Sequence, residues 1–333
     1  MEKRIRERFN DGILQSAMQR YGIAPGHIRL LDGFESFMFE FERGAQEYIL
    51  RLAHSLRRSE ALILGEADWI NYLVGGGASA AQAVPSARDR LVELIDDGRG
   101  GHFLATAFAR APGRPPWEVG WTPELYETYG RLLGRMHALT QHYQVPDPAW
   151  RRPEWDDPLM LDAGRNLPAS EALAIERHRQ VVEHVQSLAR DRASYGLIHF
   201  DAHAGNLLVD QSGAITLFDF DDCLYGWFAY DLAIVLFYMV THVDDAPSVA
   251  GKFLPPFLRG YRRENRLDPA WLHEIPWFLK LREIDLYGVI HRSFDVDNID
   301  NPWCARYMQD RKRRIEEDLP YLDFDFDALA HFL

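Results

Sequence analysis

Three polar residues with the chemistry of a metal-dependent phosphate site lie close together in the sequence. Asp201, Asn206 and Asp219 fall within the segment from Leu197 to Asp231. Two carboxylates and an amide oxygen are hard ligands that suit magnesium, which keeps several waters and binds through few protein groups plus substrate phosphates. A carboxylate beside such a metal can accept the proton of an attacking hydroxyl during phosphoryl transfer. The residue types therefore predict phosphate chemistry, with Asp201 placed to act as the base.

A β-hairpin is predicted between these residues. Apolar runs at 207–209 and 215–218 flank the segment 210–213, which has the composition of a tight turn. A turn centred in that segment brings Asn206 and Asp219 to the same end of the hairpin, where neighbouring strands lie roughly 4.8 Å apart. The three polar residues are therefore expected to converge there.

The elements before residue 110 predict a small α+β lobe. Helices are expected over 3–20 and 59–74, where apolar residues recur at helical spacing and the second run stops at three glycines. Short runs rich in apolar and aromatic residues, separated by Asp-Gly and Arg-Gly turns, predict an antiparallel sheet. The expected strands are 27–31, 36–41, 47–52, 90–96 and 102–108.

The pattern changes at residues 111–116, where Pro and Gly cluster and helical periods take over. We therefore predict two domains, a nucleotide-binding lobe at 1–109 and a helical catalytic and substrate lobe at 110–333. The fold class is α+β. The helices expected in the second lobe are 123–142, 170–192, 229–242, 249–264, 271–291 and 302–319.

Composition narrows the function classes. The 333 residues carry a formal charge of −13, of which −11 falls in residues 110–333. This balance argues against nucleic acid as a partner, because phosphate backbones bind mainly Lys and Arg. It is compatible with a cationic small substrate, although acidic surfaces more often serve solubility.

No apolar run reaches the roughly 18 to 20 residues needed to cross a bilayer, and no signal peptide is evident, so we expect a cytoplasmic protein. The two cysteines predict neither a disulfide framework nor a zinc site.

The motif His199-x-Asp201-x4-Asn206, followed by Asp219-Phe220-Asp221, resembles the catalytic and metal-binding loops of the aminoglycoside phosphotransferase and choline kinase-like family. The resemblance covers most of the chain and implies a two-lobed protein-kinase-like fold. It implies that Asp201 is the catalytic base and that Asn206 and Asp219 bind Mg²⁺. It also implies that Asp231 is a buried residue supporting the catalytic loop.

The resemblance places ATP against the first lobe. It implies a phosphate-covering loop whose backbone and Ser hydroxyl donate to phosphate oxygens, a basic strand residue held by a helix glutamate, and a hinge at 106–109 that holds the adenine. The nucleotide-binding residues it implies are Gly33, Ser36, Arg51, Glu66, Ala107 and Ala109. An alternative for Arg51 and Glu66 is an ordinary surface ion pair.

We therefore predict an ATP- and Mg²⁺-dependent phosphotransferase that moves the γ-phosphate to a hydroxyl of a small molecule. Amine-bearing acceptors of the aminoglycoside, choline or homoserine type rank first, because aromatic side chains near an acidic cleft can hold a cation. The acceptor-contacting residues suggested for the helical lobe are His203, Asp222, Tyr225, Trp227, Tyr287 and His291. The sequence does not indicate the oligomeric state.

Three alternatives stay open. A protein Ser/Thr kinase is less favoured, since Arg51 replaces the usual strand lysine and Asp221 stands where a protein kinase has glycine. A nucleotide-binding pseudokinase would bind ATP without transfer. A dinuclear metal hydrolase would use His199, Asp201 and His203 with Asp219 and Asp221 as ligands.

Overall fold

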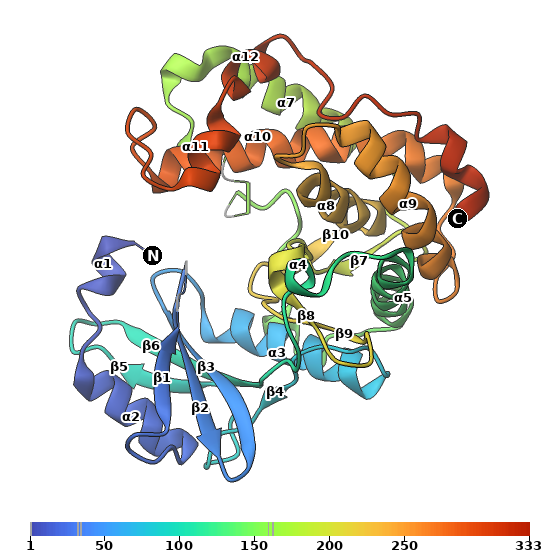
Figure 1. Ribbon diagram of the computed structural model, residues 1–333. Helices are drawn as coiled ribbons and strands as arrows, with labels where there is room; N and C mark the ends of the chain where they lie inside the picture. The colour runs from blue at the N-terminus through green and yellow to red at the C-terminus, as the bar shows by residue number, and fades with distance from the viewer. Residues whose placement is uncertain (1, 32, 34, 159, 162) are drawn as a thin grey trace. The chain divides into compact units, whose positions relative to one another are not determined.

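The computed structural model describes residues 2–31, 33, 35–158, 160–161 and 163–333 (Figure 1). The chain divides into two compact units. Unit 1 contains Met1–Gly113, Tyr143–Arg152 and Thr216–Asp221, and unit 2 contains Arg114–His142, Pro153–Ile215 and Asp222–Leu333. Two short segments that follow residue 110 in the sequence thus pack with the first unit.

A mixed-length antiparallel sheet forms the centre of unit 1. Its strands run in the order β1-β2-β3-β6-β4, and β5 also pairs with β6. The strands are β1 (Ile28–Leu31), β2 (Phe37–Arg43), β3 (Gln46–His54), β4 (Ala83–Val84), β5 (Glu93–Asp96) and β6 (His102–Ala109). The expected strands are present, and β4 was missed because two residues carry no detectable period.

Apolar side chains on both faces of this sheet pack against helices. Leu50 and Leu52 of β3 pack in one apolar cluster with Ala17 of α2 (Asp11–Tyr21), whereas Ala53 packs with Ile63 of α3 (Glu60–Gly75). Successive side chains of a strand point to opposite faces, so α2 and α3 cover opposite sides of the sheet (Figure 1).

The helix predicted over 3–20 is interrupted. α1 (Lys3–Arg6) ends early, and Asn10 accepts a hydrogen bond from the N–H of Ile13, which starts α2 afresh. An Asn in this position satisfies one of the free N–H groups at a helix start. A short 3₁₀ helix, η1 (Pro148–Trp150), completes unit 1.

Unit 2 is mostly helical. Its α-helices are α4 (Pro116–Val119), α5 (Pro123–Thr140), α6 (Ala163–Asn166), α7 (Ala172–Gln186), α8 (Phe228–Val240), α9 (Ala246–Arg262), α10 (Ile275–Ser293), α11 (Pro302–Met308) and α12 (Arg311–Glu316). Its 3₁₀ helices are η2 (Ala169–Glu171), η3 (Ala204–Asn206), η4 (Pro269–Glu274) and η5 (Asp327–Phe332). The helix expected over 302–319 is divided into α11 and α12, with Asp310 in the left-handed region at φ 60° between them.

Short strands support the loops that carry polar residues. β7 (Tyr195–Ile198) pairs antiparallel with β10 (Leu224–Trp227), and this pair was not predicted. The predicted hairpin is present as β8 (Leu207–Val209) and β9 (Ile215–Leu217), which form a two-stranded sheet. The division between the units falls inside β9, after Ile215.

Helices α5 and α9 lie side by side in unit 2 at very close range (Figure 1). A Cβ placed on Gly130 of α5 would stand 1.8 Å from the carbonyl oxygen of Phe257, and one on Gly260 of α9 would stand 2.0 Å from that of Glu127. These distances are far below any real carbon–oxygen contact, so the two backbones approach because the residues between them are glycines.

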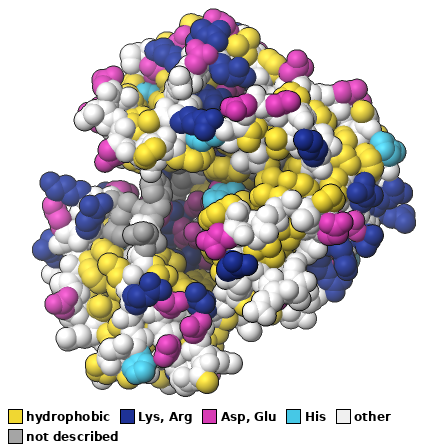
Figure 2. All heavy atoms as spheres, viewed as in Figure 1, with side chains coloured by type: hydrophobic (Ala, Val, Ile, Leu, Met, Phe, Trp, Pro, Cys, Tyr) yellow, Lys and Arg dark blue, Asp and Glu magenta, His cyan; other side chains and the backbone are white. Residues whose placement is uncertain are grey.

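Charged side chains of both signs are intermixed over the face that Figure 2 shows. Within the described part of the chain, no helix combines the length and apolar character that a membrane crossing requires.

Candidate active site

The loop that carries Asp201 follows β7 and is held through its main chain. Asp231, in the first turn of α8, accepts hydrogen bonds from the N–H of His199 at 2.9 Å and of Phe200 at 2.8 Å. The Asp231 side chain has no exposed surface. Phe200 has a φ of 68°, a left-handed conformation that non-glycine residues rarely adopt. The predicted support of this loop by a buried Asp231 is present in the structure.

A buried histidine extends this support to two further helices. His137 of α5 places Nε2 at 3.2 Å from Asp231 Oδ2 and Nδ1 at 2.9 Å from the Tyr261 hydroxyl of α9. In addition, the hydroxyl of Tyr129 donates to the carbonyl of Ala202. The sequence did not indicate His137, which lies in α5, outside the predicted site motifs.

Polar groups surround the Asp201 carboxylate, whose side chain is 23% exposed. Asn206 donates from Nδ2 to the Asp201 carbonyl at 2.9 Å and to Oδ2 at 3.0 Å. Arg282 of α10 donates from Nη2 to Oδ1 at 2.8 Å. His203 Nε2 lies 3.4 Å from Oδ2. The structure therefore brings Asp201 and Asn206 together as predicted. It adds Arg282, a cation of α10, to the same carboxylate.

These neighbours set the charge of Asp201. Burial raises the pKa of its carboxyl, but His203, Arg282 and His199 more than offset this and hold the pKa well below its usual range. Asp201 is therefore ionised at neutral pH, as a group that receives a hydrogen bond from a substrate hydroxyl must be.

Sequence reasoning did not find Arg282. The available signal was a charged residue inside the apolar run of a predicted helix, since α10 is buried along most of its length. That signal predicts a buried partner but does not identify it, because Arg282 and Asp201 are 81 positions apart.

Arg51 and Glu66 form a buried bidentate pair in unit 1. Arg51 on β3 donates to the two carboxylate oxygens of Glu66 on α3 at 2.8 and 2.6 Å. The two residues are 3% and 1% exposed. The pairing of these residues is confirmed, and the alternative of an ordinary surface pair is wrong.

Arginines surround Asp221 in the same unit. Arg51 Nη1 lies 3.7 Å from Asp221 Oδ1, Arg58 Nε lies 3.4 Å from Oδ2, and Arg57 donates to Oδ2. Burial raises the pKa of the Asp221 carboxyl, but Arg57, Arg58 and Arg51 together hold it well below its usual range. Arg57 also lies 3.3 Å from Glu35 of the predicted phosphate loop.

The other predicted nucleotide-binding residues have definite positions in unit 1. A Cβ on Gly33 would stand 2.2 Å from the Ser36 carbonyl, so this loop requires glycine there, and Ser36 is buried at 7% exposure. Ala107 and Ala109 both belong to β6, and the N–H of Ala109 donates to the Gln82 carbonyl at 2.8 Å. That N–H is therefore used within the sheet and is not free for adenine. The Phe34 position in the predicted loop lies outside the described residues.

Asp219 belongs to unit 1, whereas Asp201 and Asn206 belong to unit 2. Asp219 is exposed and has a φ of 62°, again in the left-handed region. Its convergence with the other two residues stays a prediction. The chemistry of the two side chains suits magnesium, because an amide oxygen and a carboxylate are hard ligands, and Asn206 uses its Nδ2, not its oxygen, toward Asp201.

The structure gives less support to the dinuclear hydrolase alternative and to two of the suggested acceptor contacts. Among the described residues, no group of three or more His, Cys, Asp or Glu is arranged to hold a metal ion, as the dinuclear hydrolase alternative requires. Of the suggested acceptor contacts, Trp227 has no exposed surface and Tyr287 is 3% exposed and donates to Glu171. Neither can contact an acceptor in this structure, because both side chains are part of the packed interior.

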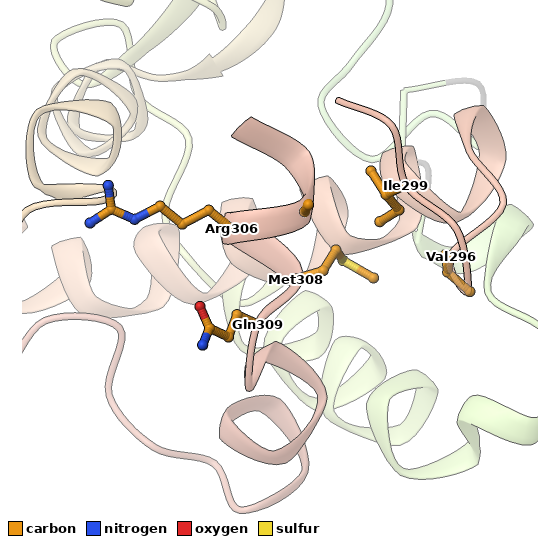
Figure 3. Close-up of a pocket in the computed structure, with 6 residues that line it drawn as sticks. Val296, Ile299, Arg306, Met308 and Gln309 are labelled. Atoms are coloured by element: carbon orange, nitrogen blue, oxygen red, sulfur yellow. The ribbon is translucent and has the colours of Figure 1, made fainter. Parts of the chain in front are cut away.

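A separate hollow of about 540 Å³ lies beside α11. In Figure 3 the Met308 side chain points toward Val296 and Ile299, whereas Arg306 and Gln309 extend to the opposite side. The hollow is open and mostly apolar, and it contains none of the predicted site residues.

Comparison with known proteins identifies the family. Residues 27–275 match the phosphotransferase enzyme family. The chain is 36% identical over 335 residues to the amicoumacin kinase of Bacillus subtilis (strain 168), with 99% of both chains covered. It is 25% identical to mouse (Mus musculus) hydroxylysine kinase, over 71% of this chain and 70% of that one. An amicoumacin kinase solved in complex with AMP-PNP, Ca²⁺ and Ami has a TM-score of 0.93 and 37% identity, covering 99% of this chain and 100% of that one.

The family match, the similar proteins and the chemistry of the site all indicate a kinase. This chain belongs to the phosphotransferase enzyme family and has its protein-kinase-like α+β fold, and it is an ATP-dependent kinase that phosphorylates a hydroxyl group of a small molecule.

Proposed function

We propose that the acceptor is an amine-bearing small molecule of the kind that amicoumacin kinase phosphorylates, and that Asp201 is the base that receives the acceptor's proton. The observation that carries the acceptor proposal is the 36% identity to amicoumacin kinase across 99% of both chains. Such coverage includes the helical unit, to which we assign the acceptor contacts. Hydroxylysine is the second candidate, because hydroxylysine kinase matches over 71% of this chain.

The roles of the site residues follow from their chemistry. Asp201 is ionised, partly exposed and fixed by Asn206 and Arg282, so it can orient the acceptor hydroxyl and accept its proton. Asn206 and Asp219 would hold Mg²⁺, which supplies charge neutralisation on the phosphates. Arg51, locked by Glu66, would contribute a fixed positive charge to the nucleotide phosphates.

Gly33 and Ser36 would cover the phosphates. Ala107 and Ala109 at the end of β6 would border the adenine, which leaves carbonyls or later residues to bond it, since the Ala109 N–H is engaged. Residues 1–109 would form most of the nucleotide-binding lobe and residues 110–333 the catalytic and acceptor lobe. We place the reaction in the cytoplasm, where ATP is available.

The test is transfer of γ-labelled phosphate from ATP with Mg²⁺ to purified acceptors. The panel contains amicoumacin, hydroxylysine, aminopropanol, choline, homoserine and an aminoglycoside. We expect label in amicoumacin or hydroxylysine; label only in another acceptor would overturn the acceptor proposal while leaving the kinase assignment.

The Asp201→Asn variant tests the base. It keeps the size of the side chain and one of the two acceptor oxygens, but it cannot take a proton. We expect transfer to fall by about 10²- to 10⁴-fold, the usual contribution of a general base, with Mg²⁺·AMP-PNP binding retained in calorimetry. Undiminished transfer would reject Asp201 as the base.

Asp219→Ala is the companion variant. We expect it to lose Mg²⁺-dependent nucleotide binding as well as transfer, because a ligand of the metal is removed. Binding of the nucleotide with an unchanged Mg²⁺ requirement would contradict the assignment of Asp219.

A further inference from the structure

Arg282 contacts the proposed base directly, although it lies outside the motifs identified in the sequence. Its Nη2 donates to Asp201 Oδ1 at 2.8 Å and to the Tyr238 hydroxyl oxygen at 2.7 Å. One nitrogen therefore joins α10, the Asp201 loop and α8. All of these residues lie in unit 2.

The guanidinium is fixed on several sides. It lies 5.4 Å from the ring centroid of Phe200 and 5.4 Å from that of Tyr238, within the range of cation–π attraction. Its side chain is 10% exposed. Burying a cation this far is unfavourable unless charge partners compensate for the lost hydration. Burial lowers the pKa of Arg282, but Tyr238, Asp201, Tyr230 and Asp285 more than reverse this, so the guanidinium stays charged.

Arg282 brings a proton acceptor and a proton donor together. The Asp201 Oδ1 and Tyr238 hydroxyl oxygens are at most 5.5 Å apart, the sum of their 2.8 and 2.7 Å distances to the same nitrogen. Because Tyr238 accepts a hydrogen bond from Arg282, its own hydroxyl proton is left to donate elsewhere. Burial raises the pKa of Tyr238 to about 12, so the hydroxyl keeps that proton at neutral pH.

The surroundings of Asp201 explain why a fixed orientation matters. Asn206 occupies one side of Oδ2 and Arg282 one side of Oδ1, so the lone pairs that remain for a substrate point in a restricted set of directions. Without Arg282, rotation about the terminal torsion of the side chain would be restrained only through Oδ2.

We propose that Arg282 is a positioning residue, which holds the Asp201 carboxylate and the Tyr238 hydroxyl as a matched pair facing the acceptor. The oxygen of the acceptor hydroxyl forms a bond to the γ-phosphorus of ATP while the bond from that phosphorus to the ADP oxygen breaks. Asp201 receives the proton that this hydroxyl loses. Tyr238 donates to a second oxygen or nitrogen of the acceptor. The acceptor class is thus a hydroxyl compound with a hydrogen-bond acceptor near the reacting group. This proposal rests on the proposed role of Asp201.

The kinetic test compares Arg282→Met and Arg282→Lys, using Mg²⁺·ATP and amicoumacin, or the panel molecule that takes up label. We expect Arg282→Met to lower kcat by about 100-fold, the effect of misplacing a reacting group by about 1 Å, with the KM for ATP unchanged. Arg282→Lys should recover part of the loss, because it restores the charge without the planar fork.

Tyr238→Phe separates the second half of the proposal. Removing the hydroxyl should raise the KM for the acceptor by about 10-fold, corresponding to one lost hydrogen bond, with a smaller change in kcat. An unchanged KM for the acceptor would reject substrate contact by Tyr238.

Arg311→Met is the matched control. Arg311 is 11% exposed and pairs with Glu283 of α10 at 2.5 Å, so its loss breaks a buried ion pair in the same unit away from Asp201. We expect a similar decrease in melting temperature with kcat retained. Equal loss of kcat in both Met variants would reduce Arg282 to a structural role and overturn the proposal.

A crystal structure of Arg282→Met makes the test independent of the acceptor. We expect the Asp201 carboxylate to rotate away from the orientation fixed by Nη2. An unmoved carboxylate would overturn the positioning role of Arg282. Absence of phosphate transfer to every acceptor in the panel would count against the proposed acceptors and would not affect this structural test.

Discussion

At the scale of single residues, the groups expected to do chemistry are held by charged or polar partners from other elements. Asp201 is held by Arg282 and Asn206, and Arg51 is held by Glu66. The motif residues could be predicted because their types and spacing are local properties of the sequence. Arg282 and His137 could not, because their roles arise from contacts that the fold makes between distant positions.

Arg51 shows what replaces the usual strand lysine. Its planar fork makes two bonds to Glu66 while Nη1 still faces Asp221 at 3.7 Å. A lysine ammonium has a single nitrogen and could not make this bidentate pair. Arginine at this position and the carboxylate at Asp221 are therefore parts of one ionic cluster.

The Asp221→Asn variant tests this cluster. Removing the carboxylate charge leaves Arg57 and Arg58 near a neutral amide in a buried setting, where breaking an ion pair from one side costs about 3 kcal/mol or more. We expect that loss in the free energy of unfolding, measured by urea denaturation.

Asp318→Asn is the control for that measurement. Asp318 lies 3.9 Å from Arg177, with side chains that are 53% and 33% exposed, and ion pairs near the surface contribute about 0 to 1 kcal/mol. If the two Asn variants lose the same stability, the arginines around Asp221 do not depend on its charge.

At the scale of elements, strands and helices with a clear period were predicted well. β2, β3, β6 and α3 lie where alternation or helical spacing placed them, because their buried faces impose that period. β7 and β10 were missed because each has four residues and pairs with a partner about 30 positions away. The break between α1 and α2 depends on the Asn10 cap, which competes with an apolar period that continues through it.

The contact between α5 and α9 gives a prediction at this scale. Gly260→Ala would place a methyl group 2.0 Å from the Glu127 carbonyl oxygen, so the helices must separate. We expect a loss of about 3 kcal/mol or more, the upper range for overpacking, measured as a shift of the urea midpoint.

Gly251→Ala in the same helix provides the comparison. The nearest atom to its added methyl is Phe324 Cε2 at 3.8 Å, an ordinary contact. We expect no loss, and up to about 1 kcal/mol of gain from helix propensity. A destabilisation equal to that of Gly260→Ala would show that α9 is sensitive to its own sequence and not to its distance from α5.

At the scale of the whole molecule, stability depends on pH through buried groups as well as through net charge. Acidic residues number 50 against 37 Lys and Arg, so the charge of −13 at pH 7 shrinks as the pH falls toward the isoelectric point of about 5.5. This relieves repulsion in every variant alike. Comparison between variants therefore isolates the contribution of a single buried group.

His178 of α7 is such a group. It is 7% exposed, and burial lowers its pKa to about 4 from the ordinary value of 6.5. The unfolded chain therefore binds a proton at His178 more readily than the folded protein does. Above pH 6.5 the histidine is neutral in both states, so its shifted pKa does not lower the free energy of unfolding. As the pH falls from 6.5 to 4, stability should decrease by about 3 kcal/mol, at 1.36 kcal/mol per pKa unit.

The measurement is the free energy of unfolding of wild type and His178→Gln across that range. Glutamine does not titrate, so we expect a shallower decline in the variant, with the two curves diverging below pH 6.5. Parallel curves would show that His178 takes up its proton without cost in the folded protein.

The attachment of the catalytic loop to Asp231 affects how the sequence can change over evolutionary time. Asp231 bonds the main-chain N–H groups of residues 199 and 200, and every amino acid except proline has one. The attachment itself therefore excludes only proline at these two positions, together with residues that cannot adopt the φ of 68° at residue 200, whereas burial restricts both side chains and His199 Nδ1 also accepts a hydrogen bond from the Asp201 N–H. Evolution can therefore change this loop only with side chains that still fill the interior, while the bonds from its main chain to Asp231 keep the base in place.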